Sequence, residues 1–163
     1  MLVGILSDSH GDHLMVREAV SLFDSLDVAH IIHCGDVCGL NVFDELAGRP
    51  VTFVWGNCDV ASDATLDYLE TLGLTAPDHV PMILELGAKR FAVFHGHERA
   101  FARALHTLDV DYLLHGHTHI ARNDRINGTR IINPGALHRA NPKTVAILDT
   151  DSDALTFHNI ERG

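Results

Sequence analysis

Short apolar runs that end in polar residues recur along the chain and predict buried strands leading into loops. Residues 2–7, LVGILS, are followed by Asp-Ser-His-Gly, the run in HIIHCGD ends in Gly-Asp, and the run in PVTFVWGN ends in Gly-Asn. Apolar positions at helical spacing predict helices over 13–26 and around 41–47, with Asp12 as N-cap of the first and Gly48 ending the second. The order strand, helix, strand, helix, strand predicts an α/β first third with parallel pairing.

The second half of the chain changes to a pattern that predicts hairpins. PMILELGAKRFAVFHGH has two apolar runs around Gly87, and RINGTRIINPG carries Asn127-Gly128 between strand-like runs, a pair typical of tight turns. A helix is expected over 98–108, a strand in VDYLLHGHTH, and two closing strands in TVAILDTDSDALTFHNI. No linker, repeat or low-complexity tract interrupts the chain, so residues 1–163 are expected to form a single domain.

Composition and charge narrow the class of protein. Apolar residues make up 46% and charged residues 21% of the 163, as in ordinary globular proteins. The formal charge of −10 would repel a phosphate backbone, so no nucleic-acid partner is expected, although a bound metal could make one cleft positive. No apolar stretch is long enough to span a bilayer, and the start, MLVGILSDSH, lacks a basic region. We therefore expect a cytoplasmic protein without a membrane partner.

The three cysteines, Cys34, Cys38 and Cys58, are too few for a disulfide framework and odd in number, which predicts reduced thiols. Cys34 and Cys38 have the spacing of half a zinc site. No second cysteine pair completes that site, so we expect buried structural thiols.

Polar residues at the ends of five predicted strands carry the candidate chemistry. Ligands of open α/β sheets bind beyond the carboxyl ends of the strands, so these residues are expected to converge on one cleft. They are Asp8 and His10, then Asp36, then Asn57, then His95, and finally His117 and His119. Seven nitrogen and oxygen ligands exceed what one tetrahedral zinc takes, so we expect two divalent ions, with one carboxylate bridging them. Such ions, roughly 3.5–4 Å apart, clamp the attacking and leaving oxygens of a displacement at phosphorus.

The alternating histidines in LLHGHTHIA fit this interpretation. In an extended segment alternate residues share a face, so His117 and His119 are expected to point into the cleft together, as are Asp8 and His10. His115 has the same parity but lies deeper in the strand, and we expect it to support a ligand or the fold.

The ordered motifs SDSHGD, CGDV, WGNCD, FHGH, HGHTH and NPGA together resemble the calcineurin-like metallophosphoesterase superfamily. They run from residue 7 to residue 136, most of the chain, and the ordered set is highly specific although each motif alone is weak. Within the superfamily, the length and the GNCD variant resemble the small YfcE-type phosphodiesterases. The resemblance implies a four-layer α-β-β-α sandwich, in which two mixed sheets are flanked by helices.

The resemblance also implies a role for each candidate ligand. The first metal would be held by Asp8, His10, Asp36 and His119, and the second by Asp36, Asn57, His95 and His117, so that Asp36 bridges. A hydroxide shared by the two ions would attack phosphorus in a small phosphoester, with a phosphodiester as the leading substrate class. Mn²⁺ is the first expectation for both ions, and Ni²⁺, Fe²⁺, Zn²⁺ or Co²⁺ also suit such ligands. A homo-oligomer is compatible with the resemblance, because small members often form dimers or tetramers.

The chain departs from the superfamily pattern in two motifs. Cys58 stands where the usual GNH[DE] histidine protonates the leaving oxygen, and a thiol with a reference pKa of about 8.5 is a less apt proton donor than an imidazole. Asp59 would normally orient that histidine. Both residues are catalytic candidates beside Asp36 and Asn57. Ala136 stands where small members often carry Ser, which removes a hydroxyl that could contact the phosphate or a neighbouring group.

Two other functions fit the same fold. A protein-binding scaffold, like the vacuolar-sorting members of the superfamily, would have lost some ligands, whereas all seven positions here hold good ones. A nuclease would carry DNA-contacting domains or a basic stripe, and this sequence has neither. Outside the ligand set, His97 either supports a neighbouring ligand or is solvated, and Arg99 and Arg103 are expected on a solvated helix face.

Overall fold

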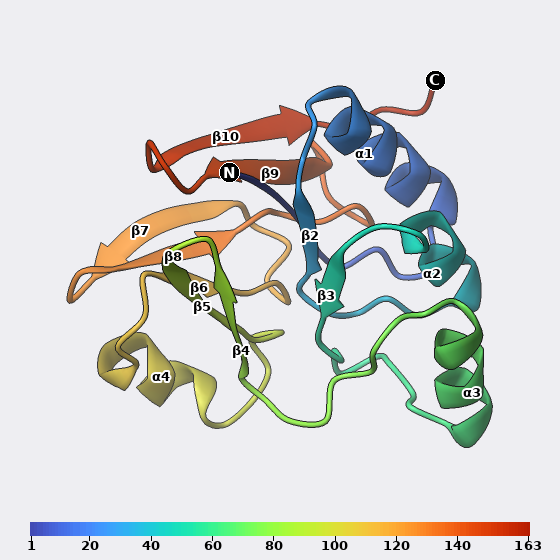
Figure 1. Ribbon diagram of the computed structural model, residues 1–163, viewed down its shortest axis with the longest axis horizontal. Helices are drawn as coiled ribbons and strands as arrows, with labels where there is room; N and C mark the ends of the chain where they lie inside the picture. The colour runs from blue at the N-terminus through green and yellow to red at the C-terminus, as the bar shows by residue number, and fades with distance from the viewer.

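The opening apolar run forms the central strand of the first of two sheets. The strands of this sheet are β1 (Leu2–Leu6), β2 (His30–His33), β3 (Val51–Phe53), β9 (Thr144–Asp149) and β10 (Ala154–Asn159). In the computed structural model, which describes residues 1–163, their order is β10-β9-β1-β2-β3 (Figure 1). β1, β2 and β3 pair in parallel, as the sequence predicts, and β9 and β10 extend the sheet as antiparallel strands.

The second sheet contains both predicted hairpins. Its strands are β4 (Met82–Leu86), β5 (Lys89–Val93), β6 (Tyr112–Leu114), β7 (Arg122–Ile126) and β8 (Thr129–Asn133), in the order β4-β5-β6-β8-β7. β5, β6 and β8 are parallel, while the antiparallel partners β4 and β7 lie at the two edges. The hairpins turn at Gly87 and at Asn127-Gly128, as expected from their turn residues.

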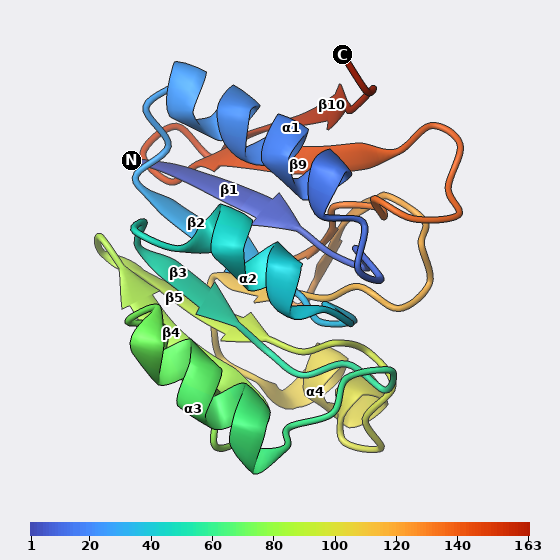
Figure 2. The same cartoon turned by 90° about the vertical axis from the view of Figure 1, so that its right-hand side faces the viewer.

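Helices cover the outer face of each sheet, which gives four layers (Figure 2). The helices are α1 (His13–Ser25), α2 (Leu40–Leu46), α3 (Asp63–Thr71) and α4 (Phe101–Thr107). One apolar cluster joins α1, α2 and α3 to the first sheet, and another joins α4 to the second. A third cluster fills the space between the sheets and includes Val3, Ile32, Val93 and Leu114, all fully buried. The expected α-β-β-α sandwich of two mixed sheets is therefore confirmed.

The helix α3 was not expected from the sequence, and the three expected helices differ in their bounds, α1 ending at Ser25 rather than at residue 26. Ser62 caps α3 by accepting the N–H of Thr65 at 3.2 Å, and the buried Leu69 anchors the helix to the core. This serine and the leucine at helical spacing are the signal that sequence reasoning missed. Asp12 caps α1 as predicted, accepting the N–H of Met15 at 3.4 Å. α4 is shorter than predicted, and α2 ends one residue before Ala47.

The cysteines differ in their surroundings. Cys34 is buried between the sheets, as expected. Cys38 is exposed and free, so the expectation of a buried thiol is wrong for it, and Cys58 is exposed and free as well. Each follows a strand end and lies in a loop, where no second layer of structure covers it. None of the four helices reaches the length and apolarity that crossing a membrane requires.

Candidate metal centre

The predicted ligands lie in loops at the carboxyl ends of strands from both sheets. Those on the first sheet follow β1, β2 and β3, and those on the second follow β5 and β6. The parallel direction of these strands brings all five loops to one end of the sandwich. The structure therefore gathers the seven predicted side chains in one cluster at this end of the sandwich.

Asp8 and His119 form one side of the cluster with His10. Nε2 of His119 lies 3.2 Å from Oδ1 of Asp8, and Nε2 of His10 lies 3.4 Å from Nε2 of His119. Nε2 of His10 is also 3.5 Å from Oδ2 of Asp36. Three donors from two loops, those after β1 and β6, thus face a common centre, with Asp36 beside it.

His95 gathers the other side. Its Nε2 lies 3.4 Å from Oδ2 of Asp36 and 3.2 Å from Oδ1 of Asn57. The His117 ring is 5.1 Å from the His95 ring between centroids, and its backbone N–H donates to Oδ2 of Asp8 at 3.0 Å. Asp36 therefore lies within reach of histidines on both sides.

Two features of these residues fit a bound cation. Oδ1 of Asp8 is buried and accepts no hydrogen bond, which is costly for a carboxylate oxygen. Nδ1 of His95 lies 2.8 Å from the Cys34 carbonyl and must donate its proton there, which leaves a lone pair on Nε2. That lone pair faces oxygens of Asp36 and Asn57, so no hydrogen bond links the nitrogen to either oxygen. A positive ion between them removes the repulsion, and histidine with carboxylate and amide oxygens suits first-row divalent metals.

The ligand loops are not extended. The expectation that each pair of ligands points into the cleft because alternate residues of a strand share a face is therefore wrong. β1 ends at Leu6 and β6 at Leu114, before the ligands begin. The backbone is left-handed at Asp8 (φ 52°) and His10 (φ 44°), and also at His117 and His119 (φ 68° and 59°). Non-glycine residues rarely adopt this conformation. The two side chains of each pair meet the cluster because the backbone bends at both.

Hydrogen bonds between loops hold this strained backbone. The N–H of Asp8 donates to the Gly35 carbonyl at 3.0 Å, and the N–H of His10 donates to the Asp36 carbonyl at 2.9 Å. Burial acts to raise the pKa of Asp36, and the backbone N–H of Cys58, which donates to its Oδ1 at 2.8 Å, acts to lower it; the pKa is lowered overall. The carboxylate therefore stays ionised.

His33, which sequence reasoning gave no role, ties the loops after β1 and β2 together. It is fully buried, and the N–H of Gly35 donates to its Nδ1 at 3.2 Å. The proton of the neutral ring is therefore on Nε2, which donates to Oγ of Ser9 at 2.9 Å, and that hydroxyl donates to the Val37 carbonyl. Burial lowers the pKa of His33 to about 3, so the ring is neutral. Nothing in the local pattern distinguishes His33 from a surface histidine.

Glu98 and Asn133 perform the same task on the second sheet. Glu98 accepts the N–H groups of His95 and Gly96 at 2.8 and 2.7 Å. Asn133 donates from Nδ2 to the Gly116 carbonyl at 2.8 Å, which fixes the start of the loop that carries the paired histidines. Asn133 belongs to the NPGA motif and was visible there, whereas Glu98 carried no signal.

His115 has a structural position. It is 3% exposed, its ring packs 4.8 Å from the ring of Phe101, and its Nδ1 lies 3.3 Å from Nδ2 of Asn133. Burial lowers its pKa to about 4, which keeps the imidazole neutral. His97 is exposed, with its ring 5.3 Å from that of His95.

Three further residues considered from the sequence are not among the seven ligands. Arg99 and Arg103 are exposed, as expected for solvated charges, and Ala136 is fully buried.

Asp59 joins the loops after β2 and β3. Its Oδ1 accepts the N–H of Cys38 and its Oδ2 accepts the N–H of Gly56, both at 2.7 Å. Cys58 lies at the rim, where Nδ2 of Asn57 donates to its sulfur at 3.3 Å. Burial and the neighbouring Asp36 raise the pKa of the Cys58 thiol, so it keeps its proton near neutral pH.

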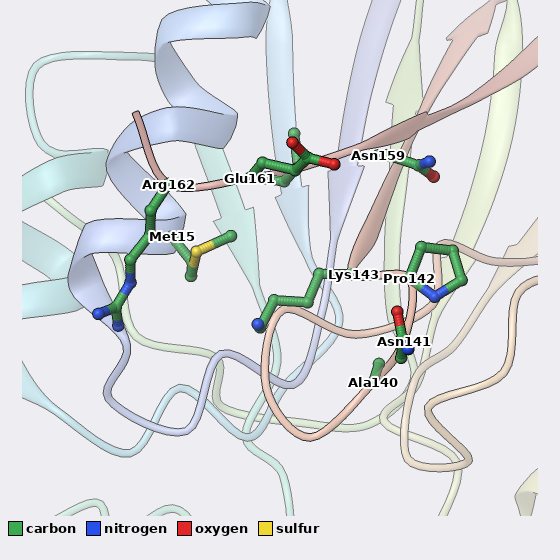
Figure 3. Close-up of a pocket in the computed structure, with 9 residues that line it drawn as sticks. Met15, Ala140, Asn141, Pro142, Lys143, Asn159, Glu161 and Arg162 are labelled. Atoms are coloured by element: carbon green, nitrogen blue, oxygen red, sulfur yellow. The ribbon is translucent and has the colours of Figure 1, made fainter.

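A separate hollow of about 370 Å³ lies between the start of α1, the segment 140–143 and the last residues of the chain (Figure 3). Its charged side chains are Lys143, Glu161 and Arg162, and none of the predicted ligands lines it. It therefore lacks the chemistry of the metal cluster.

Comparison with known proteins agrees with this geometry. Residues 1–153 match the family model described as the calcineurin-like phosphoesterase superfamily domain. Phosphodiesterase MJ0936 of Methanocaldococcus jannaschii is 29% identical over 93% of this chain and 94% of its own length. The solved structure of an archaeal phosphodiesterase superposes with a TM-score of 0.87 at 25% identity, covering 99% of this chain and all of the other. The Escherichia coli phosphoesterase YfcE shares the fold, with a TM-score of 0.70 at 22% identity over 99% of this chain and all of its own.

Proposed function

Because the chain belongs to the calcineurin-like phosphoesterase superfamily, it is a metal-dependent phosphoester hydrolase, and we propose that it is a phosphodiesterase with a dinuclear centre. The observation that carries the proposal is the position of Asp36. One of its oxygens lies 3.5 Å from His10 and 3.4 Å from His95, between the two groups of donors. Asp36 is thus suited to bridge two ions.

The ligand sets follow from these groupings. The first ion would be held by Asp8, His10, Asp36 and His119, and the second by Asp36, Asn57, His95 and His117. When bound, two divalent ions, with Mn²⁺ as the leading choice, supply a hydroxide nucleophile and positive charge that balances the charge developing at phosphorus.

The chain's own residues prepare this centre. The carbonyl of Cys34 fixes the proton of His95 on Nδ1, so Nε2 is free to bind a metal. Cys58 stands at the rim as a protonated thiol, in a place to give a proton to the leaving oxygen. Asp59 bonds to backbone N–H groups rather than to a side chain, so we assign it a positioning role.

The substrate class is a small phosphodiester. The net charge of −10 opposes binding to a long nucleic acid, and the bound ions would make only this end of the sandwich positive. A protein-binding scaffold is the alternative, and the complete set of seven donors favours the enzyme.

Hydrolysis of bis-p-nitrophenyl phosphate with added Mn²⁺ tests the proposal. Asp36→Asn is expected to lower the rate by at least about 100-fold, because the amide that replaces the carboxylate cannot bridge two ions. Asp67→Asn, an exposed carboxylate on α3, is the matched control and should retain the rate. Absence of turnover with each of Mn²⁺, Ni²⁺, Co²⁺ and Zn²⁺ would contradict the proposal and favour the scaffold.

A further inference from the structure

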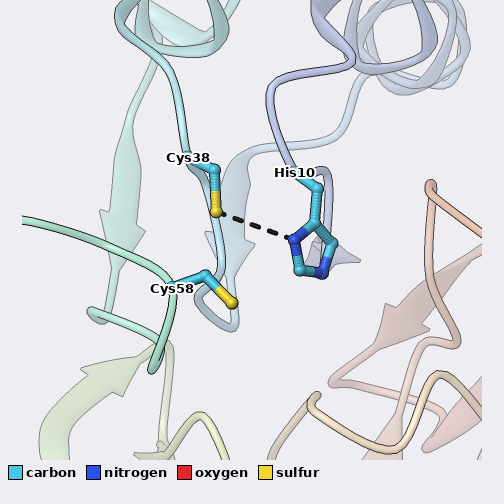
Figure 4. A group of neighbouring side chains, drawn as sticks. All are labelled: His10, Cys38 and Cys58. Atoms are coloured by element: carbon cyan, nitrogen blue, oxygen red, sulfur yellow. Dashed lines mark hydrogen bonds between the residues drawn. The ribbon is translucent and has the colours of Figure 1, made fainter.

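Two thiols and an imidazole converge beside the candidate metal centre. Cys38 comes from the loop after β2, Cys58 from the loop after β3, and His10 from the loop after β1 (Figure 4). One donor atom from each lies within 4.8 Å of the other two. Sγ of Cys38 is 3.7 Å from Nδ1 of His10. None of the expected roles of the seven ligands uses this nitrogen or either sulfur.

The spacing of these donors suits a tetrahedral metal. Metal–sulfur bonds of about 2.3 Å and metal–nitrogen bonds of about 2.0–2.1 Å, at tetrahedral angles, separate the donor atoms by about 3.5–3.8 Å. The distance between Cys38 and His10 already falls in that range. The Cys58 sulfur lies within 4.8 Å of both other donors, and its side chain is exposed, so it is free to turn toward them.

The two edges of the His10 ring face different chemistry. Nε2 lies 3.5 Å from Asp36 and 3.4 Å from Nε2 of His119, whereas Nδ1 faces the sulfur of Cys38. Oxygen and imidazole donors suit hard and intermediate ions, and thiolates select soft ones. The donors on the two edges therefore differ in the metals that they prefer.

The thiols are held in place and open to solvent. Asp59 accepts the backbone N–H of Cys38 at 2.7 Å, and Asp36 accepts that of Cys58 at 2.8 Å. Each cysteine therefore has a carboxylate bonded to its backbone. These negative charges favour a cation. Both cysteines line a surface pocket of about 240 Å³ that also contains Trp55, through which an ion can enter.

We propose that Cys38, Cys58 and Nδ1 of His10 form a second site, which binds a thiophilic divalent cation such as Zn²⁺ or Cd²⁺. Binding forms two metal–thiolate bonds and one metal–imidazole bond, and the two thiol protons pass to solvent. Where Nε2 of His10 also held an ion, the ring proton would pass to solvent too, leaving an imidazolate. Water completes the tetrahedron from the pocket side. This site adjoins the hydrolytic centre and shares the His10 ring with it, and an ion bound there would take the Cys58 thiol away from proton donation. Its existence does not depend on the proposed function.

Cadmium alone is the probe, added to reduced, metal-free protein, with the ultraviolet thiolate-to-cadmium charge-transfer band as readout. The band reports sulfur ligation only, so Cd²⁺ in the carboxylate and histidine cluster is silent. Cys38→Ser and Cys58→Ser are each expected to weaken the binding that produces the band by at least about tenfold. Cys34→Ala, which removes a fully buried thiol of the core, is the matched control and should keep the band. Circular dichroism checks that every variant is folded.

The outcomes separate the two-thiol site from its alternatives. A band that saturates in the wild type and in Cys34→Ala, and that each of the other two variants loses or develops only at an at least about tenfold higher Cd²⁺ concentration, supports the site. Absence of the band in reduced wild-type protein, or loss in only one of the two variants, overturns it. Hydrolysis of bis-p-nitrophenyl phosphate with Mn²⁺ is a separate measurement, so a failure of either proposal is recognised independently.

Discussion

The loops that carry the candidate ligands and the turns that close the hairpins both use left-handed backbone, but they do so with different residues. The β7–β8 turn places Asn127 (φ 51°) and Gly128 (φ 93°) there, the two residue types that tolerate it best. The ligand loops place Asp8, His10 and Asp36 there instead, with φ between 44° and 54°. The turns therefore use the residue types that adopt this backbone most readily, and the ligand loops use aspartate and histidine, which adopt it less readily than glycine.

The difference shows what holds each region in its shape. A hairpin turn is stable because its own residues favour the bend, so neighbouring structure contributes little. In the ligand loops each unfavourable residue is balanced by bonds to another loop, such as that from the N–H of His10 to the Asp36 carbonyl. Substitutions should thus have larger effects in the ligand loops than in the turns, and four variants test this.

Gly56→Ala should have the largest effect. A Cβ at this position would overlap Oδ1 and the backbone nitrogen of Asp36, and neither can move without disturbing the cluster. We expect a loss of about 3 kcal/mol in the free energy of unfolding and of most Mn²⁺-dependent hydrolysis. Urea denaturation and a Mn²⁺ titration measure both, and a variant within 1 kcal/mol of the wild type would show that the loop adapts freely.

Asp59→Ala should come next, because it removes the shared acceptor of two loops. The N–H groups of Cys38 and Gly56 would each lose a bond of 2.7 Å to a charged oxygen. We expect a loss of about 2 kcal/mol in unfolding free energy. Asp67→Ala, an exposed carboxylate on a helix, should change stability by less than about 0.5 kcal/mol. Equal effects of the two substitutions would remove Asp59 from its positioning role.

His33 predicts a pH dependence of intermediate size. Its pKa of about 3 in the folded protein lies below the ordinary value of 6.5, so the unfolded chain binds the proton first as the pH falls. The stability associated with this residue is complete above pH 6.5 and is lost as the pH falls from there toward 3. Between pH 7.5 and 5.5 the loss should be about 1.3 kcal/mol greater for the wild type than for His33→Gln. Parallel stability curves for the two proteins would contradict the assignment.

Gly128→Ala should have the smallest effect. The position is left-handed, and a Cβ there meets nothing within 4 Å, so the variant has only backbone strain to overcome. The expected loss is about 1 kcal/mol, with hydrolysis unchanged. A thermal unfolding curve measures it, and a loss equal to that of Gly56→Ala would abolish the distinction between the two regions.

This distinction also explains how far the sequence could predict the molecule. The β4–β5 and β7–β8 hairpins and the parallel strands of the first sheet were predictable because apolar runs and turn residues such as Gly87 and Asn127-Gly128 act locally. The gathering of the ligands was predictable from their place at strand ends. The backbone conformation that aims these side chains was not predictable, because the left-handed backbone at His10 and His117 depends on bonds between loops that are distant in sequence.

The residues that support the ligands were still harder to predict from the sequence. His33 and Glu98 act through two hydrogen bonds each, Glu98 to two backbone N–H groups and His33 to one backbone N–H group and the Ser9 hydroxyl, and such bonds leave no periodic signal. Cys38 was expected to be buried because cysteine usually is, whereas its position after a strand end decides its exposure. The roles of the seven ligands stay predictions until a metal is measured.

The apolar cluster between the two sheets has a consequence for the metal selectivity of the candidate centre. Asp8 and Asp36 are anchored to one sheet and His95 to the other, so the width of the apolar layer sets how far apart the carboxylates and this imidazole stand. Larger or smaller side chains at Val93 or Leu114 would widen or narrow that gap without touching a single donor. Evolution could therefore retune which ion this protein prefers from deep inside its hydrophobic interior.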